Sequence, residues 1–127
     1  MRTSLITPYI FSALVVIVSA NAGLNQLLGA HPFWSVSVAW IGVPVGLILA
    51  IAIKYLGLGW TQRVLLFLVC LVAAYALASF GKARFAASFA EDATAGRLWY
   101  FGWIAAAAFA AALIAATFSP TRSQTAE

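Results

Sequence analysis

Three amide side chains stand close together near the end of the first apolar stretch of the chain: Asn21, Asn25 and Gln26. An amide donates and accepts hydrogen bonds without carrying charge, and it is costly to place in hydrocarbon unless a partner satisfies it. One interpretation is a lining that binds an uncharged polar or lipid-like solute. The other is a set of hydrogen bonds between helices, worth about 1 kcal/mol each in membranes. The sequence leaves both interpretations open.

The remaining residues that could do chemistry are few and scattered. Glu91 and Asp92 are adjacent, so on a helix they point in different directions and do not form an acid/base pair. His31 is the single histidine and Cys70 the single cysteine, which provides neither a haem ligand pair nor a thiolate metal cluster. The sequence therefore predicts no catalytic residues, no metal site and no cofactor, and thus a protein that is not an enzyme.

Four apolar runs separate these residues, over 8–28, 33–53, 64–80 and 98–118. Each run is close to the roughly 20 residues that a helix needs to cross the hydrocarbon core of a bilayer. The chain is 65% hydrophobic and only 8% charged, which excludes a soluble domain of this size. We expect an all-α integral membrane protein, a single domain over 1–127 with four transmembrane helices and a short polar tail at 119–127.

The first run also resembles a secretory signal, because Arg2 precedes an apolar stretch that ends in Ala20-Asn21-Ala22. Small residues in this spacing suit signal peptidase. Against cleavage, the apolar character continues to Leu28, and Thr7-Pro8 is typical of a helix start. We therefore expect the first span to be retained, with a cleaved signal peptide as the alternative.

A polar segment, 81–97, connects the third and fourth runs. On a helical wheel Phe85 and Phe89 lie on one side, and Arg84 and Glu91 lie on the other. This pattern predicts a short helix that lies in the membrane interface between spans three and four.

Two groups of small residues predict close helix packing. Gly42 and Gly46 leave a flat patch on the second span, and Pro44 between them removes a backbone donor and predicts a kink. In the fourth span the alanines recur every four residues, at Ala108, Ala112 and Ala116. We expect this alanine face to pack on the glycines of the second span or on another polypeptide.

Charge placement predicts orientation rather than a binding partner. The net charge is +4, but the seven Lys and Arg residues lie between and beyond the apolar runs, which argues against nucleic-acid binding. The first connection, 29–32, carries no Lys or Arg, whereas Lys54 and Arg63 bracket the second connection. The positive-inside rule then predicts both termini in the cytoplasm of a bacterium, with the chain in the inner membrane.

These observations lead to two hypotheses about function. The first is a non-enzymatic accessory or assembly partner of a larger membrane complex, or a homo-oligomer, because the spans carry no charged residue and much small-residue surface. The alternative is a small carrier or channel for an uncharged or lipid-like solute, lined by the three amides and bent at Pro44. Either protein has the lipid bilayer as its first partner.

Overall fold

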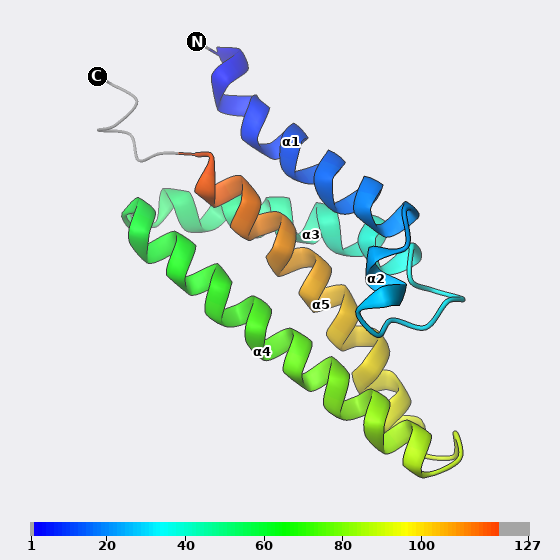
Figure 1. The fold of residues 1–127 in the computed structure, drawn as a ribbon. Coiled ribbons are helices and arrows are strands. Elements are labelled where there is room, and N and C mark those ends of the chain that lie inside the picture. Colours follow the sequence, from blue (N-terminus) through cyan, green and yellow to red (C-terminus); the bar gives the residue numbers. More distant parts are fainter. Residues whose placement is uncertain (1, 120–127) are drawn as a thin grey trace.

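A computed structural model describes residues 2–119, and these residues form helices joined by short turns, without a strand. The elements in chain order are α1 (Arg2–Asn21), α2 (Leu24–Leu27), α3 (Ser37–Tyr55), α4 (Trp60–Ala87) and α5 (Ala93–Thr117), as drawn in Figure 1. Within this part of the chain three helices are long and apolar enough to cross a membrane, namely α3, α4 and α5. The protein is therefore an all-helical membrane protein.

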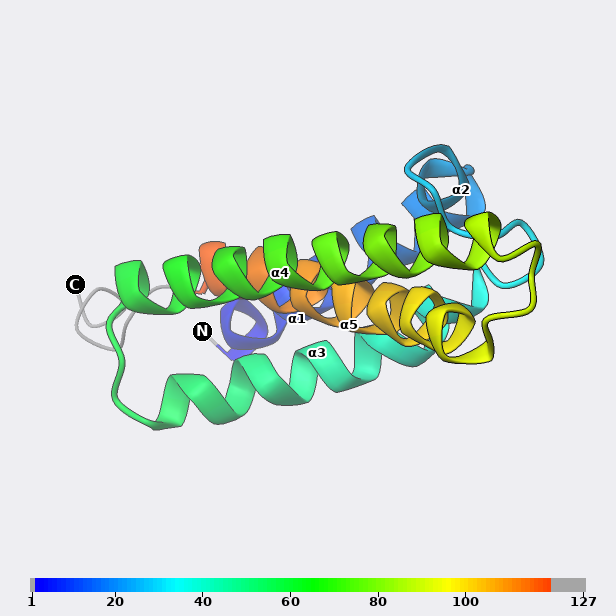
Figure 2. The ribbon, with the colours of Figure 1, turned by 90° about the horizontal axis from the view of Figure 1, so that it is seen from below.

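The last helix, α5, is the centre of the fold. Each of α1, α3 and α4 packs on it, and α4 has its main contacts with α5 alone (Figures 1 and 2). The two ends of the bundle are named after one residue near each, Arg63 and Trp99. At the Arg63 end α3 ends, α4 begins and α5 ends, and at the Trp99 end α4 ends and α5 begins.

Small residues allow α5 to occupy this position. A Cβ atom added to Gly42 would lie 2.7 Å from the carbonyl oxygen of Ile104, and one added to Gly46 would overlap the carbonyl oxygen of Ala108. On the other side, a Cβ at Gly102 would meet Ala78 of α4 at 2.8 Å. The backbones of three helices thus approach to distances that a larger side chain would prevent.

The first apolar run differs from the prediction of one helix over 8–28. Helix α1 starts at Arg2, with Pro8 inside it, and ends at Asn21. Gly23 then adopts a left-handed backbone with φ of 97°, which breaks the helix before the short α2. Helix α1 therefore has 20 residues, and its segment Leu5–Asn21 is an apolar helix.

The prediction of a separate interfacial helix between spans three and four is wrong. Helix α4 continues without a break through Gly81 to Ala87, because Gly81 lets the backbone of α5 approach at Trp99 instead of ending the helix. The chain then turns at Phe89 and Ala90, both with positive φ, and Asp92 caps α5 by accepting a hydrogen bond from the Ala95 amide. Of the predicted interfacial residues, Arg84 and Phe85 therefore lie at the end of α4, and Phe89 and Glu91 lie in the turn before α5.

The other three spans start a few residues away from the predicted positions: α3 at Ser37 instead of 33, α4 at Trp60 instead of 64 and α5 at Ala93 instead of 98. The second run begins with turns, since the amide of Trp34 bonds the carbonyl of His31, and α3 starts only at Ser37. Of the predicted tail at 119–127, only Ser119 is among the described residues.

Candidate functional site

The three amides of the first run do not converge. The exposed Asn21 donates to the carbonyl of Ile17 in its own helix, at 2.9 Å. Asn25 is buried and donates to the carbonyl of Ser35 at 2.8 Å, which ties α2 to the turn before α3. Gln26 is exposed. The break at Gly23 separates Asn21 from the other two, and of the three amides Asn25 lines a hollow between α1 and α4.

The glycines and the proline of α3 occupy opposite sides of that helix. Gly42 and Gly46 are buried against Ala107 and Ala108 of α5, whereas Pro44 between them is exposed. The helix continues through Pro44 to Tyr55. Pro44 thus lies on the face of α3 that points away from α5.

The alanine face of α5 lies inside the chain. Ala108, Ala112 and Ala116 are all buried, the first against Gly46 and the other two in a cluster with Ala50 and Phe67. Ser12 of α1 donates a hydrogen bond to the carbonyl of Ala111 on a neighbouring side. These alanines are therefore covered by the chain's own helices. Of the two partners expected for them, the second span and another polypeptide, the structure shows the second span.

The bundle is not closed between α1 and α4. An apolar hollow of about 460 Å³ lies there, with α5 as its floor. Val15 and Ser19 line it from α1, Leu71 and Val72 from α4, and Ala110 from α5. Figure 1 shows α5 between these two helices. Sequence periodicity did not predict this hollow. The hollow depends on the distance between α1 and α4, which both pack on α5.

A second hollow, of about 370 Å³, continues toward the Trp99 end. The two hollows share Leu28, Tyr75 and Trp103, and the Tyr75 hydroxyl donates to the carbonyl of Leu28 at 2.7 Å. Ser79 and Lys82 of α4 line the second hollow beyond this bond. Together the hollows form one feature, which we call the α1–α4 groove: apolar over most of its length and polar at one end.

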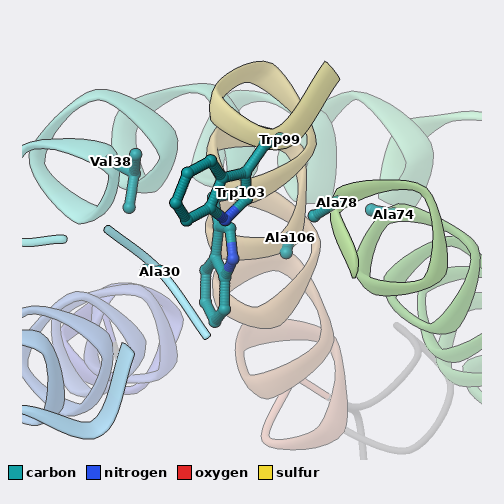
Figure 3. Packing of buried hydrophobic residues seen from close by; sticks show 7 residues of the cluster. All are labelled: Ala30, Val38, Ala74, Ala78, Trp99, Trp103 and Ala106. Atoms are coloured by element: carbon teal, nitrogen blue, oxygen red, sulfur yellow. The ribbon is translucent and has the colours of Figure 1, made fainter. Parts of the chain in front are cut away.

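A cluster of aromatic rings lies beside the polar end of this groove. Trp34 lies 5.2 Å from Trp99 and 5.2 Å from Tyr100, measured between ring centroids, and His31 stacks on Trp34. The Trp99 indole donates to the carbonyl of Gly29 at 3.0 Å. Figure 3 shows Trp99 and Trp103 projecting from α5 to the side on which Val38 and Ala30 lie, with Ala74 and Ala78 of α4 on the other side. Such a group of amphipathic rings is typical of the level of lipid headgroups.

The sequence did not predict that the cationic side chains of Lys54 and Arg63 come together at the Arg63 end. Arg63 is 1% exposed, and its Nη2 donates to the carbonyl of Ser119 at 2.8 Å. Lys54 donates to the Ser119 hydroxyl at 3.1 Å, and the Trp60 indole donates to the carbonyl of Thr117 at 2.9 Å. Arg63 and Trp60 thus satisfy carbonyls at and just beyond the C-terminus of α5, and Lys54 bonds the hydroxyl of the same Ser119. Basic and aromatic residues stand directly before the third run in the sequence. They indicated only the orientation of the chain in the membrane.

The other residues that could do chemistry lie apart. Asp92 is the cap of α5, Glu91 beside it is exposed, and Cys70 is half-buried on α4. In residues 2–119 no three His, Cys, Asp or Glu side chains come together as metal ligands. The α1–α4 groove combines a hollow shape with polar side chains at one end and is therefore the candidate site.

Comparison of the chain with protein families, with curated protein sequences and with solved structures gives no match.

Proposed function

We propose that the protein is a non-enzymatic membrane protein that acts through its outer surface, as an accessory or assembly partner of a larger membrane complex or as a homo-oligomer. The observation that supports this proposal is the filled interior. Gly42 and Gly46 bring the backbone of α3 onto α5, and Gly102 does the same for α4. A path for a solute between α5 and either α3 or α4 would require the helix backbones to move apart. The surfaces left for function are the groove and the outward faces of the helices.

The same proposal includes a position in the membrane. We propose four spans in the inner membrane of a bacterium, with α1 as a span beside α3, α4 and α5 and both termini in the cytoplasm. The Arg63 end then faces the cytoplasm, where Lys54 and Arg63 satisfy the positive-inside rule. The Trp99 end faces outward.

Photocrosslinking tests association directly. A photoreactive amino acid is placed at Leu14 of α1, Ile48 of α3 or Leu77 of α4, each more than half exposed, and at the fully buried Ala111 as control. We expect at least one exposed position to yield an adduct of higher mass in the native membrane, while position 111 yields none. An adduct of twice the chain mass indicates a homo-oligomer, and another mass indicates a different partner. Monomers at all three positions would contradict the proposal.

The second candidate is a carrier of lipid-like solutes, and the α1–α4 groove is the observation that favours it. The groove opens sideways between two helices and its floor is apolar. Movement of fluorescent phospholipid between leaflets of reconstituted vesicles tests this candidate. Transport that is lost in Ala110→Trp, which fills the groove, and kept in Leu77→Trp would support the carrier. Vesicles whose flux equals that of protein-free vesicles would exclude it.

A further inference from the structure

We propose that the α1–α4 groove binds one anionic phospholipid, with an acyl chain in the apolar hollow and the phosphate at Lys82. This inference goes beyond the proposed function, because an accessory protein and a carrier could both hold such a lipid. It rests on the polarity of the groove, on the charge at its end and on the depth of that charge in the bilayer.

The apolar hollow has the chemistry of an acyl-chain site. It runs along α5 from Trp103 to Ile114, with small side chains such as Ala106 and Ala110 on its floor. Valine and leucine side chains of α1 and α4 form its walls. A flexible hydrocarbon chain can fill such an irregular space and restore the dispersion contacts that α1 and α4 do not make with each other.

The polar end presents hydrogen-bond donors on one face of α4. Tyr75, Ser79 and Lys82 follow at intervals of four and three residues, so they lie on the same face, and all three line the second hollow. Lys82 lies 6.0 Å from the centroid of the Trp99 ring and forms no ion pair with a carboxylate among residues 2–119. The Tyr75 hydroxyl already donates to the carbonyl of Leu28, so the donors that remain for a phosphate are the Ser79 hydroxyl and the Lys82 ammonium.

The depth of Lys82 favours a lipid over a helix of another protein. Trp34, Trp99 and Tyr100 place the Trp99 end at the level of the headgroups. From that level the apolar hollow extends past Leu71, near the middle of α4, to Ile114 in the last turn of α5. An anionic group at the interface joined to a hydrocarbon chain that points to the midplane is the structure of a phospholipid.

Native mass spectrometry of the full chain in mild detergent tests the proposal with two lipids that share the same acyl chains, phosphatidylglycerol and phosphatidylcholine. We expect one phosphatidylglycerol to bind in preference to phosphatidylcholine. Lys82→Gln should lower phosphatidylglycerol binding about fivefold, the effect expected for one cation near an anionic headgroup, and leave phosphatidylcholine unchanged. Ala110→Trp, which fills the apolar hollow, should lower the binding of both lipids.

Arg84→Gln is the matched control, because Arg84 lies two residues from Lys82 but contacts the ring of Phe80 and does not line the groove. Equal losses for Lys82→Gln and Arg84→Gln would overturn the proposal in favour of general attraction to the surface. Equal binding of both lipids to the unmodified chain would also overturn it. If Ala110→Trp fails to fold, a photoreactive residue at Val72 decides: a lipid adduct supports the proposal, and an adduct with a polypeptide contradicts it.

Discussion

The Arg63 guanidinium donates to the carbonyl oxygen of Ser119 at 2.8 Å and so joins the first turn of α4 to the end of α5. The side chain is 1% exposed, although it carries a charge. A buried cation at this position offsets the partial negative charge of the α5 C-terminus and satisfies a carbonyl that has no partner in its own helix. The contact therefore contributes to the antiparallel pairing of the two longest helices.

We predict that Arg63→Met destabilises the fold by about 2 kcal/mol, because a hydrogen bond from a charged donor is lost and a carbonyl is left without it. Thermal unfolding in detergent measures the change. Arg84→Met is the control, since Arg84 is exposed on the same helix. Equal midpoints for the two variants would show that the Arg63 contact does not stabilise the protein.

The contact between Gly46 and Ala108 gives a second prediction. A methyl group at position 46 overlaps the carbonyl of Ala108, so Gly46→Ala must push α3 away from α5 and is expected to cost about 1–3 kcal/mol. Gly59→Ala is matched in chemistry, because a Cβ there lies 3.8 Å from the Gln62 side chain and meets no backbone. A lower unfolding midpoint for Gly46→Ala alone is the expected result, and equal midpoints contradict it.

The sequence predicted the membrane class and the existence of the long helices, because runs of apolar residues report burial in lipid directly. It did not predict the ends of α1, where Gly23 breaks an apolar stretch that hydropathy presents as continuous. Nor did it predict that α4 passes through Gly81, since a glycine that permits close approach cannot be distinguished by sequence from one that ends a helix. The α1–α4 groove depends on helix spacing, which no local pattern encodes.

The amides of the first run should differ in their effects on stability. Asn25→Leu removes a buried hydrogen bond to the carbonyl of Ser35 and should lower stability by about 1 kcal/mol. Asn21→Leu replaces an exposed side chain that bonds only within its own helix, and we expect a change within about 0.5 kcal/mol. Unfolding midpoints of the two single variants, compared at equal protein concentration, measure the difference. A larger loss for Asn21→Leu would show that Asn21 has a partner outside the chain.

The proposed orientation predicts which single cysteines react with a membrane-impermeant maleimide in intact cells, in a Cys70→Ser background. Phe33→Cys, in the exposed turn before α3, should react, because that turn faces outward. Leu56→Cys, in the exposed turn after α3, should react only after the membrane is permeabilised. The reverse pattern would place both termini outside.

The last prediction concerns whether α1 remains part of the protein. Its face of Ser12, Val16 and Ala20 is buried in the bundle, and Ser12 bonds the carbonyl of Ala111. Loss of residues before Gly23 would expose this side of α5, so we expect the first helix to be retained. Yet α1 ends at Asn21 and Ala22 is exposed, which leaves the possible cleavage site outside a helix.

The intact mass of the purified chain, compared with that of Ala22→Leu, separates the two cases. The leucine removes the small residue that signal peptidase requires and lies at an exposed position, where the fold tolerates it. We expect both proteins to retain the residues before Gly23 and to differ only by the substitution. A shorter wild-type chain that begins at Gly23, beside a full-length Ala22→Leu variant, would show that the first run is a signal peptide and that α3, α4 and α5 form the mature protein.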